Sequence, residues 1–173
     1  MIFKLIGGIC VIAAASALGF AKAREYKTRV QQLSAMQTAV AQFETEIRFT
    51  QTPLAEAFLA VATAADGSIG ALFKQAGQTL ARQSGQTAGS AWNLAVDAIR
   101  GKLSLSKEDI EIFRAFGSAL GSSDTEGQMK HIAATQEKLS AQITQARQAC
   151  EKNQKLFQSL GVYAGILIAI LLF

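Results

Sequence analysis

Two uninterrupted apolar runs, at residues 5–21 and 160–173, enclose a longer segment rich in alanine, glutamine, serine and charged residues. This middle segment lacks the strict alternation of apolar and polar residues that is typical of a half-buried β-strand. Its commonest residues are instead good helix formers, and its apolar positions recur at helical spacing. The pattern therefore predicts an all-α protein, with an antiparallel bundle of about six helices and a membrane helix at each end.

Residues that cap, turn or end helices divide the middle segment. Thr52 is predicted to be an N-cap with Pro53 in the first helical position. Ser106, followed by Asp109 three residues later, forms a capping box whose acid is one methylene short. Further boundaries are predicted at Asp66-Gly67, Thr87, Gly121 and Asp124. The predicted helices span residues 22–50, 53–64, 68–82, 87–101, 107–120 and 125–172.

The first and last of these helices carry apolar residues in steps of three and four, which is the spacing of a coiled-coil seam. The first seam consists of Leu33, Met36, Val40, Phe43 and Ile47. The last consists of Met129, Ile132, Gln136, Leu139, Ile143, Ala146 and Cys150. We expect the two long helices to pack antiparallel, with Phe43 and Ile47 close to Met129 and Ile132.

The apolar ends predict transmembrane helices at 1–21 and 156–173, with a cytoplasmic domain at 22–155 between them. The first run has about 17 uninterrupted apolar residues, close to the roughly 20 that a spanning helix needs. A cleaved signal peptide is the alternative, but residues 18–20 stay apolar and basic residues follow at once. Counted from residue 156, the last run makes about 27 Å of helix, which crosses a slightly thinned bilayer.

Basic residues flank the middle segment on both sides, and this predicts a two-pass protein whose middle segment is cytoplasmic. They are Lys22, Arg24, Lys27, Arg29, Lys152 and Lys155. Within the last run, Gly161 and Gly165 have the spacing that allows close helix packing. Their partner is either the first membrane helix or a neighbouring subunit, so a homo-oligomer stays open.

The residues favour no enzymatic chemistry, cofactor or metal. Neither a phosphate-binding glycine motif nor a basic stripe for nucleic acid occurs, and the formal net charge is only +4. His131 is the only histidine, so a metal site assembled from histidines is ruled out, and a surface or partner contact is expected there. Glu44 and Glu46 lie two positions apart on a helix, point to different faces and cannot share a proton.

Several stretches, in this order and spacing, resemble the stage III sporulation protein AB family of endospore-forming bacteria. They are KLIG near the start, ETEIRFTQTPLAEAF at 44–58, AW at 91–92, FRAFGSALGSSDTEGQMKHI at 113–132 and KLFQSLGVYAGILIAILLF at 155–173. The family is similar to the cytoplasmic helical domain of the type II secretion F platform protein. The resemblance implies an inner-membrane part of a channel-like complex that links mother cell and forespore, beside a secretion-type ATPase.

On this basis, we expect the turn after the first long helix to contact that cytosolic ATPase. The candidate interface residues are Glu44, Glu46, Arg48, Thr52, Pro53, Leu54, Asp124 and His131. An alternative function is a membrane-anchored helical sensor or regulatory protein, which should bind a small ligand within the bundle. An enzyme with dispersed acids is a third.

Overall fold

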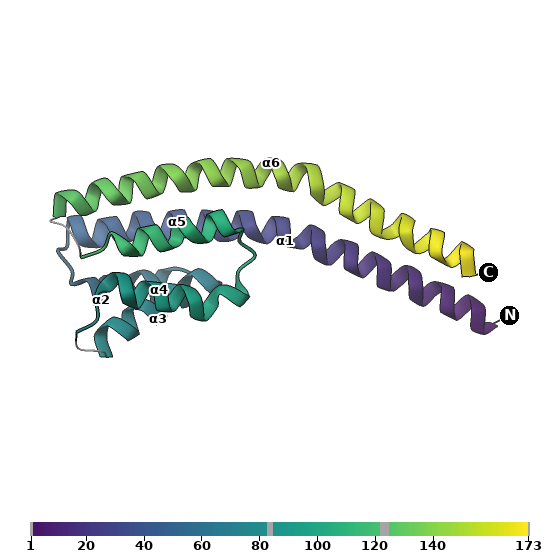
Figure 1. Ribbon diagram of the computed structural model, residues 1–173, viewed down its shortest axis with the longest axis horizontal. Coiled ribbons are helices and arrows are strands. Elements are labelled where there is room, and N and C mark those ends of the chain that lie inside the picture. Colours follow the sequence, from purple (N-terminus) through teal and green to yellow (C-terminus); the bar gives the residue numbers. More distant parts are fainter. Residues whose placement is uncertain (1, 83–84, 122–124, 173) are drawn as a thin grey trace. The chain divides into compact units, whose positions relative to one another are not determined.

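The computed structural model describes residues 2–82, 85–121 and 125–172, and near both ends of the chain it describes only some of the side chains. Helices alone occur among these residues, so the prediction of an all-α protein is confirmed. The elements are α1 (Ile2–Arg48), α2 (Leu54–Ala64), α3 (Gly67–Arg82), α4 (Ala88–Ile99), the short 3-10 helix η1 (Arg100–Lys102), α5 (Lys107–Ser118) and α6 (Thr125–Leu172) (Figure 1).

The chain forms two compact units, and each has its own packing. One unit comprises Met1–Val30 and Gln145–Phe173, and the other comprises Gln31–Thr144. We call these the terminal unit and the bundle unit. The first part of α1 and the last part of α6 make up the terminal unit, where small side chains such as Ala23 and Ala146 are buried. Small residues allow two helices to approach closely.

A surface ion pair of the terminal unit joins Lys22 to Glu25, whose Nζ and Oε2 atoms lie 2.6 Å apart. The hydrogen bond to the Glu25 carboxylate raises the pKa of Lys22 above its usual value, so this ammonium group stays charged at physiological pH.

Within the part of the chain that the structure describes, no helix combines the length and the apolar character needed to cross a bilayer. The two predicted transmembrane segments, 1–21 and 156–173, fall largely on side chains outside the described residues, and so do Gly161 and Gly165. The structure therefore gives the membrane helices no support, and they stay predictions.

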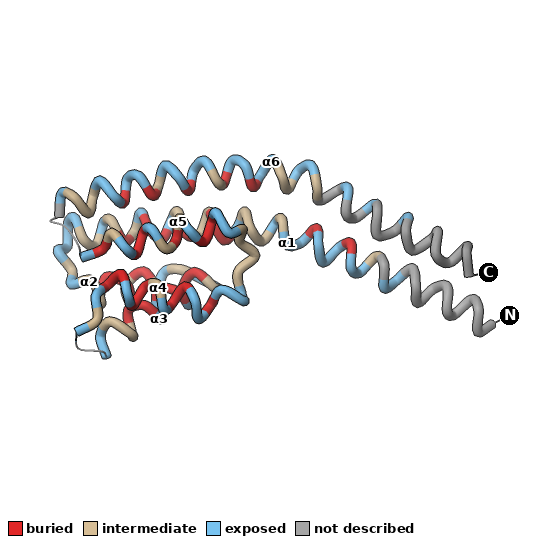
Figure 2. The backbone as a smooth tube through the Cα atoms, in the orientation of Figure 1, coloured by how far each residue is buried: buried red, intermediate tan, exposed pale blue. Residues whose placement is uncertain are grey.

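Five helices of the bundle unit contribute aromatic side chains to a common core, and one ring from each contacts others of the group. These residues are Phe43 from α1, Phe58 from α2, Phe73 from α3, Trp92 from α4 and Phe116 from α5, and all are at most 1% exposed. Figure 2 shows the buried positions on the facing sides of α2, α3, α4 and α5. The ring centroids of Phe43 and Phe58 lie 5.0 Å apart, and those of Trp92 and Phe116 lie 4.9 Å apart. Such pairs stabilise a core beyond the burial of their apolar area.

Trp92 fits this core because its neighbour on α5 has no side chain. A Cβ atom at Gly117 would lie 2.0 Å from Cδ1 of Trp92, which is far inside van der Waals contact. The indole Nε1 donates a hydrogen bond to the carbonyl oxygen of Phe113 across 2.6 Å. Burial of the indole therefore leaves its polar atom satisfied.

Within the bundle unit, α1 and α6 run antiparallel, as predicted. Gln136 donates from Nε2 to the carbonyl oxygen of Gln37 across 3.0 Å. Further along α1, Ile47 lines the same cleft as Gln128 of α6. Residue numbers that rise along α1 therefore lie beside residue numbers that fall along α6, so the two helices run in opposite directions.

The predicted seams are mostly buried, but a coiled coil is not supported. Leu33, Met36, Val40 and Phe43 are fully buried on α1, as are Ile132 and Leu139 on α6. Phe43, however, packs against rings from α2, α3 and α5. The seam of α1 is therefore part of a core shared by several helices, whereas a coiled coil would pack it against one partner helix.

Two of the predicted caps are confirmed. The Thr87 side chain accepts a hydrogen bond from the Ser90 amide. Ser106 and Asp109 form a complete capping box, despite the shorter acid. Gly121 has a φ of +73°, which suits a residue that follows a helix end. Asp124, the last predicted cap, lies outside the described residues.

Candidate protein-contact site

The chain turns sharply between α1 and α2, and we call residues 44–54 the corner. The amide of Thr52 donates to the carbonyl oxygen of Glu46 across 3.2 Å, which closes the turn back onto the last helical residues of α1. Gln51 has a φ of +51°, a left-handed conformation that non-glycine residues adopt rarely. Backbone in this region costs on the order of 1–3 kcal/mol and persists only where its surroundings hold it.

Thr52 does not cap α2, so this part of the prediction is wrong. The N-cap position belongs to Pro53, which has an extended backbone and no side-chain capping bond. Since α2 begins one residue later than expected, the Thr52 hydroxyl turns back to α1 and donates to Oε2 of Glu46 across 3.1 Å. Thr52 stabilises the corner by holding α1, and the start of α2 lacks a side-chain cap.

Of the three predicted interface acids, Glu44 and Glu46 are engaged within the corner. Glu46 accepts the hydrogen bonds from Thr52 at its carboxylate and its backbone carbonyl. Glu44 lies 3.8 Å from Arg48 in an i,i+4 ion pair, and its side chain is 33% exposed. The side chain of Arg48 is 59% exposed. The Arg48 guanidinium is therefore more accessible to a partner than the carboxylate of Glu44.

Phe49 is the most prominent surface feature of the corner, and the sequence analysis missed it. Its residue exposure is 74%, and the Arg48 guanidinium carbon lies 5.4 Å from the centre of its ring. A cation at this distance from an aromatic face is attracted to it. The available signal was position: Phe49 lies off the α1 seam, two residues after Ile47, so the helix cannot bury it with the other apolar residues.

Beside this pair, the corner contains an open cleft of about 450 Å³. Its lining residues come from the end of α1, the turn, the start of α2 and one position of α6: Ile47, Arg48, Gln51, Thr52, Pro53, Leu54 and Gln128. The prediction that Leu54 is buried is met in part, because Leu54 is half-buried. A Cβ atom added at Gly121 would lie 3.5 Å from its Cδ1. Arg48 is the only charged residue among the described residues of this lining.

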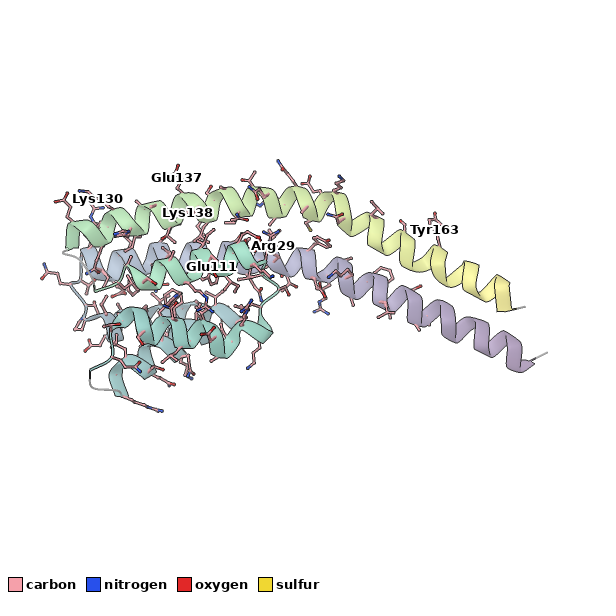
Figure 3. The ribbon with its side chains drawn as sticks, in the orientation of Figure 1. Arg29, Glu111, Lys130, Glu137, Lys138 and Tyr163 are labelled. Atoms are coloured by element: carbon pink, nitrogen blue, oxygen red, sulfur yellow. The ribbon has the colours of Figure 1, made fainter. Side chains whose placement is uncertain are left out.

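The remaining candidates on α6 are not brought into the corner. His131 is exposed and does not line the cleft, and Asp124 lies outside the described residues. Lys130, next to His131, forms an ion pair with Glu126 at 2.9 Å on the surface of α6 (Figure 3). Among the described side chains, no group of three potential metal ligands occurs.

The fold and the corner define a helical-bundle protein with an exposed aromatic side chain at the turn between α1 and α2. The family described as stage III sporulation protein AB matches residues 4–173. The stage III sporulation protein AB of Bacillus subtilis (strain 168) is 33% identical over 169 residues, which cover 98% of each chain. A solved structure of stage III sporulation protein AB (SpoIIIAB) superimposes with a TM-score of 0.68 at 29% identity, over 72% of this chain and 97% of that chain.

The chain therefore belongs to the stage III sporulation protein AB family, and its role is in sporulation. The resemblance found in the sequence is confirmed.

Proposed function

We propose that the protein is a non-enzymatic platform component of the channel-like complex between mother cell and forespore, and that its corner binds a cytosolic secretion-type ATPase. In this proposal residues 1–21 and 156–173 anchor the chain in the mother-cell membrane, with residues 22–155 in the cytoplasm. The family assignment supports a place in sporulation. The apolar terminal runs and their basic flanks support the anchoring.

The observation that carries the ATPase contact is the exposed pair Arg48–Phe49. Aromatic residues and arginine are enriched among the residues that contribute most to protein–protein binding. Phe49 is too exposed to contribute to the bundle core, and Arg48 holds its ring from one face. The turn behind the pair is fixed by the bonds between Thr52 and Glu46, so little conformational freedom is lost on binding.

Co-purification of the tagged protein from sporulating cells tests this proposal. The Phe49→Ala variant should lose the ATPase and keep the wild-type melting temperature, since an exposed side chain contributes little to folding. Leu94→Ala is the matched control, because Leu94 is also a large apolar residue of the bundle unit and is 49% exposed. Retention of the ATPase by Phe49→Ala would overturn the proposed contact.

The alternative function, a sensor, is favoured by one observation, the cleft at the corner. Its volume of about 450 Å³ lies within the range of small-ligand pockets. A metabolite that raises the melting temperature of the wild-type protein, with no such rise in Arg48→Gln, would favour that function.

A further inference from the structure

Gln51, in the corner of the bundle unit, combines a strained backbone with an unused side chain. Its φ of +51° lies in the left-handed region, which a glycine adopts without steric cost and a glutamine adopts rarely. Its side chain is exposed, lines the corner cleft and makes no hydrogen bond within the described part of the chain. The fold alone therefore gives no reason for a glutamine at this position.

The turn holds this strained backbone in place. The amide of Thr52 donates to the carbonyl oxygen of Glu46 across 3.2 Å, and its hydroxyl donates to Oε2 of Glu46 across 3.1 Å. Backbone outliers that are held by their surroundings in this way cluster at ligand-binding and active sites. The strain at Gln51 therefore points to a role for the side chain that this backbone places at the cleft.

The lining of the cleft combines neutral polar side chains with apolar ones. The polar residues are Gln51, Thr52 and Gln128, and the apolar residues are Ile47, Pro53 and Leu54. Thr52 is already bonded to Glu46, and Gln128 has an interaction of its own. Among the described lining residues, Gln51 therefore has the carboxamide that the fold leaves available. A carboxamide offers a donor and an acceptor, which are the two groups of a peptide unit.

We propose that Gln51 binds the main chain of an extended segment of the ATPase, whose apolar side chains pack in the cleft against Ile47, Pro53 and Leu54. The proposal rests on the proposed contact between the corner and the ATPase. An extended segment fits because its main-chain N–H and C=O groups are not used within a helix. Since six of the seven lining residues are uncharged, recognition here depends on main-chain bonding and apolar contact.

Two substitutions in the full chain separate the side chain of Gln51 from its backbone. Gln51→Ala removes the carboxamide and keeps a Cβ in the left-handed region, so it should melt like the wild type and bind the purified ATPase about fivefold more weakly. Gln51→Gly should bind equally weakly but melt about 3 °C above Gln51→Ala, because the strain is relieved. Gln75→Ala, at an exposed glutamine of α3, is the matched control and should change neither quantity.

A cross-link then identifies the bound segment. Phe49, which is exposed beside the cleft, is replaced by the photoreactive p-benzoylphenylalanine, and mass spectrometry locates the linked ATPase peptide. Single backbone amides of this peptide are next changed to esters. We expect one ester to weaken binding to the wild type by about fivefold and to have no effect on binding to Gln51→Ala, since the two changes remove the same hydrogen bond.

Four outcomes would contradict the proposal, and they point to different errors. Full affinity of Gln51→Ala with weak binding by Gln51→Gly would show that backbone rigidity matters and the carboxamide does not. Equal effects of every ester on both proteins would rule out the main-chain bond. If both Gln51 variants bind like the wild type and Phe49→Ala does not, the ATPase contact stands and the role of Gln51 is wrong. If Phe49→Ala also binds like the wild type, the proposed ATPase contact is wrong, and the role of Gln51 falls with it.

Discussion

The hydroxyl group of Thr52 donates to the Glu46 carboxylate across 3.1 Å, so a threonine in the turn holds the last helical turn of α1. The same two residues are also joined through their backbones at 3.2 Å. This double link explains how Gln51 is kept in a left-handed conformation between α1 and α2. It also makes the corner a fixed surface from which Phe49 projects.

Removing the side-chain part of this link should destabilise the protein moderately. We expect Thr52→Val to lower the free energy of unfolding by about 1 kcal/mol, because it leaves the Glu46 carboxylate without this donor. Glu44→Gln is the control, and loss of its partly exposed ion pair with Arg48 should cost less than about 0.5 kcal/mol. Urea unfolding measures both. Equal values for the two variants would contradict the structural role of Thr52.

Gly117 should be the least replaceable glycine of the aromatic core. In Gly117→Ala the new methyl group would overlap the indole of Trp92, and we expect a loss of about 3 kcal/mol, at the upper end for an overpacked core. The protein has one tryptophan, so its fluorescence reports the change directly. Gly101→Ala, where the added Cβ meets open space, should unfold within about 0.5 kcal/mol of wild type. A stable Gly117→Ala protein with unchanged fluorescence would show that the core packs differently.

Gln32 of α1 should control the order of the loop that joins α4 to α5 through η1, which we call the η1 loop. Gln32→Leu removes the acceptor of the Ser104 amide and a donor to the Lys102 carbonyl, and we expect it to cost about 2 kcal/mol. Amide hydrogen exchange at Ser104 should accelerate, since its bond to Gln32 is lost. The exposed neighbour serves as the control, and Gln31→Leu should leave both quantities unchanged. Unaltered exchange at Ser104 in Gln32→Leu would mean that the loop is held by other contacts.

The proposed membrane topology leads to a labelling experiment. In a chain whose Cys10 and Cys150 are replaced by serine, the exposed positions Ser90 and Ser140 are changed to cysteine one at a time. Both cysteines should resist an impermeant maleimide in intact cells and react after lysis, because the bundle unit would be cytoplasmic. Reaction without lysis would place the bundle unit on the other side of the membrane.

Local signals in the sequence predicted most helix boundaries, because capping chemistry depends on residues close in the chain. Ser106 and Asp109 form the expected capping box, and Thr87 caps α4. The corner was predicted less well. Whether Thr52 caps α2 or bonds to Glu46 depends on the left-handed backbone at Gln51. The presence of a glutamine does not predict that conformation.

The sequence analysis missed Gln32 and Phe49 for a related reason. Gln32 lies in a helix with many glutamines, and only the folded chain shows that this one is buried against the η1 loop. Phe49 lies off the α1 seam and so is not buried with the other apolar residues of that helix, but the sequence does not show whether the turn after it covers its ring. Its exposure depends on the path of the turn, which is a tertiary property.

The central claim is that the Arg48–Phe49 pair binds the ATPase, and the dissociation constant of the purified partners tests it most directly. Loss of a buried aromatic anchor costs about 2 kcal/mol, so Phe49→Ala should weaken binding about 30-fold. Leu94→Ala should change it less than about twofold, and both variants should melt like the wild type. Equal affinity of Phe49→Ala and wild type for the ATPase would contradict the proposed contact.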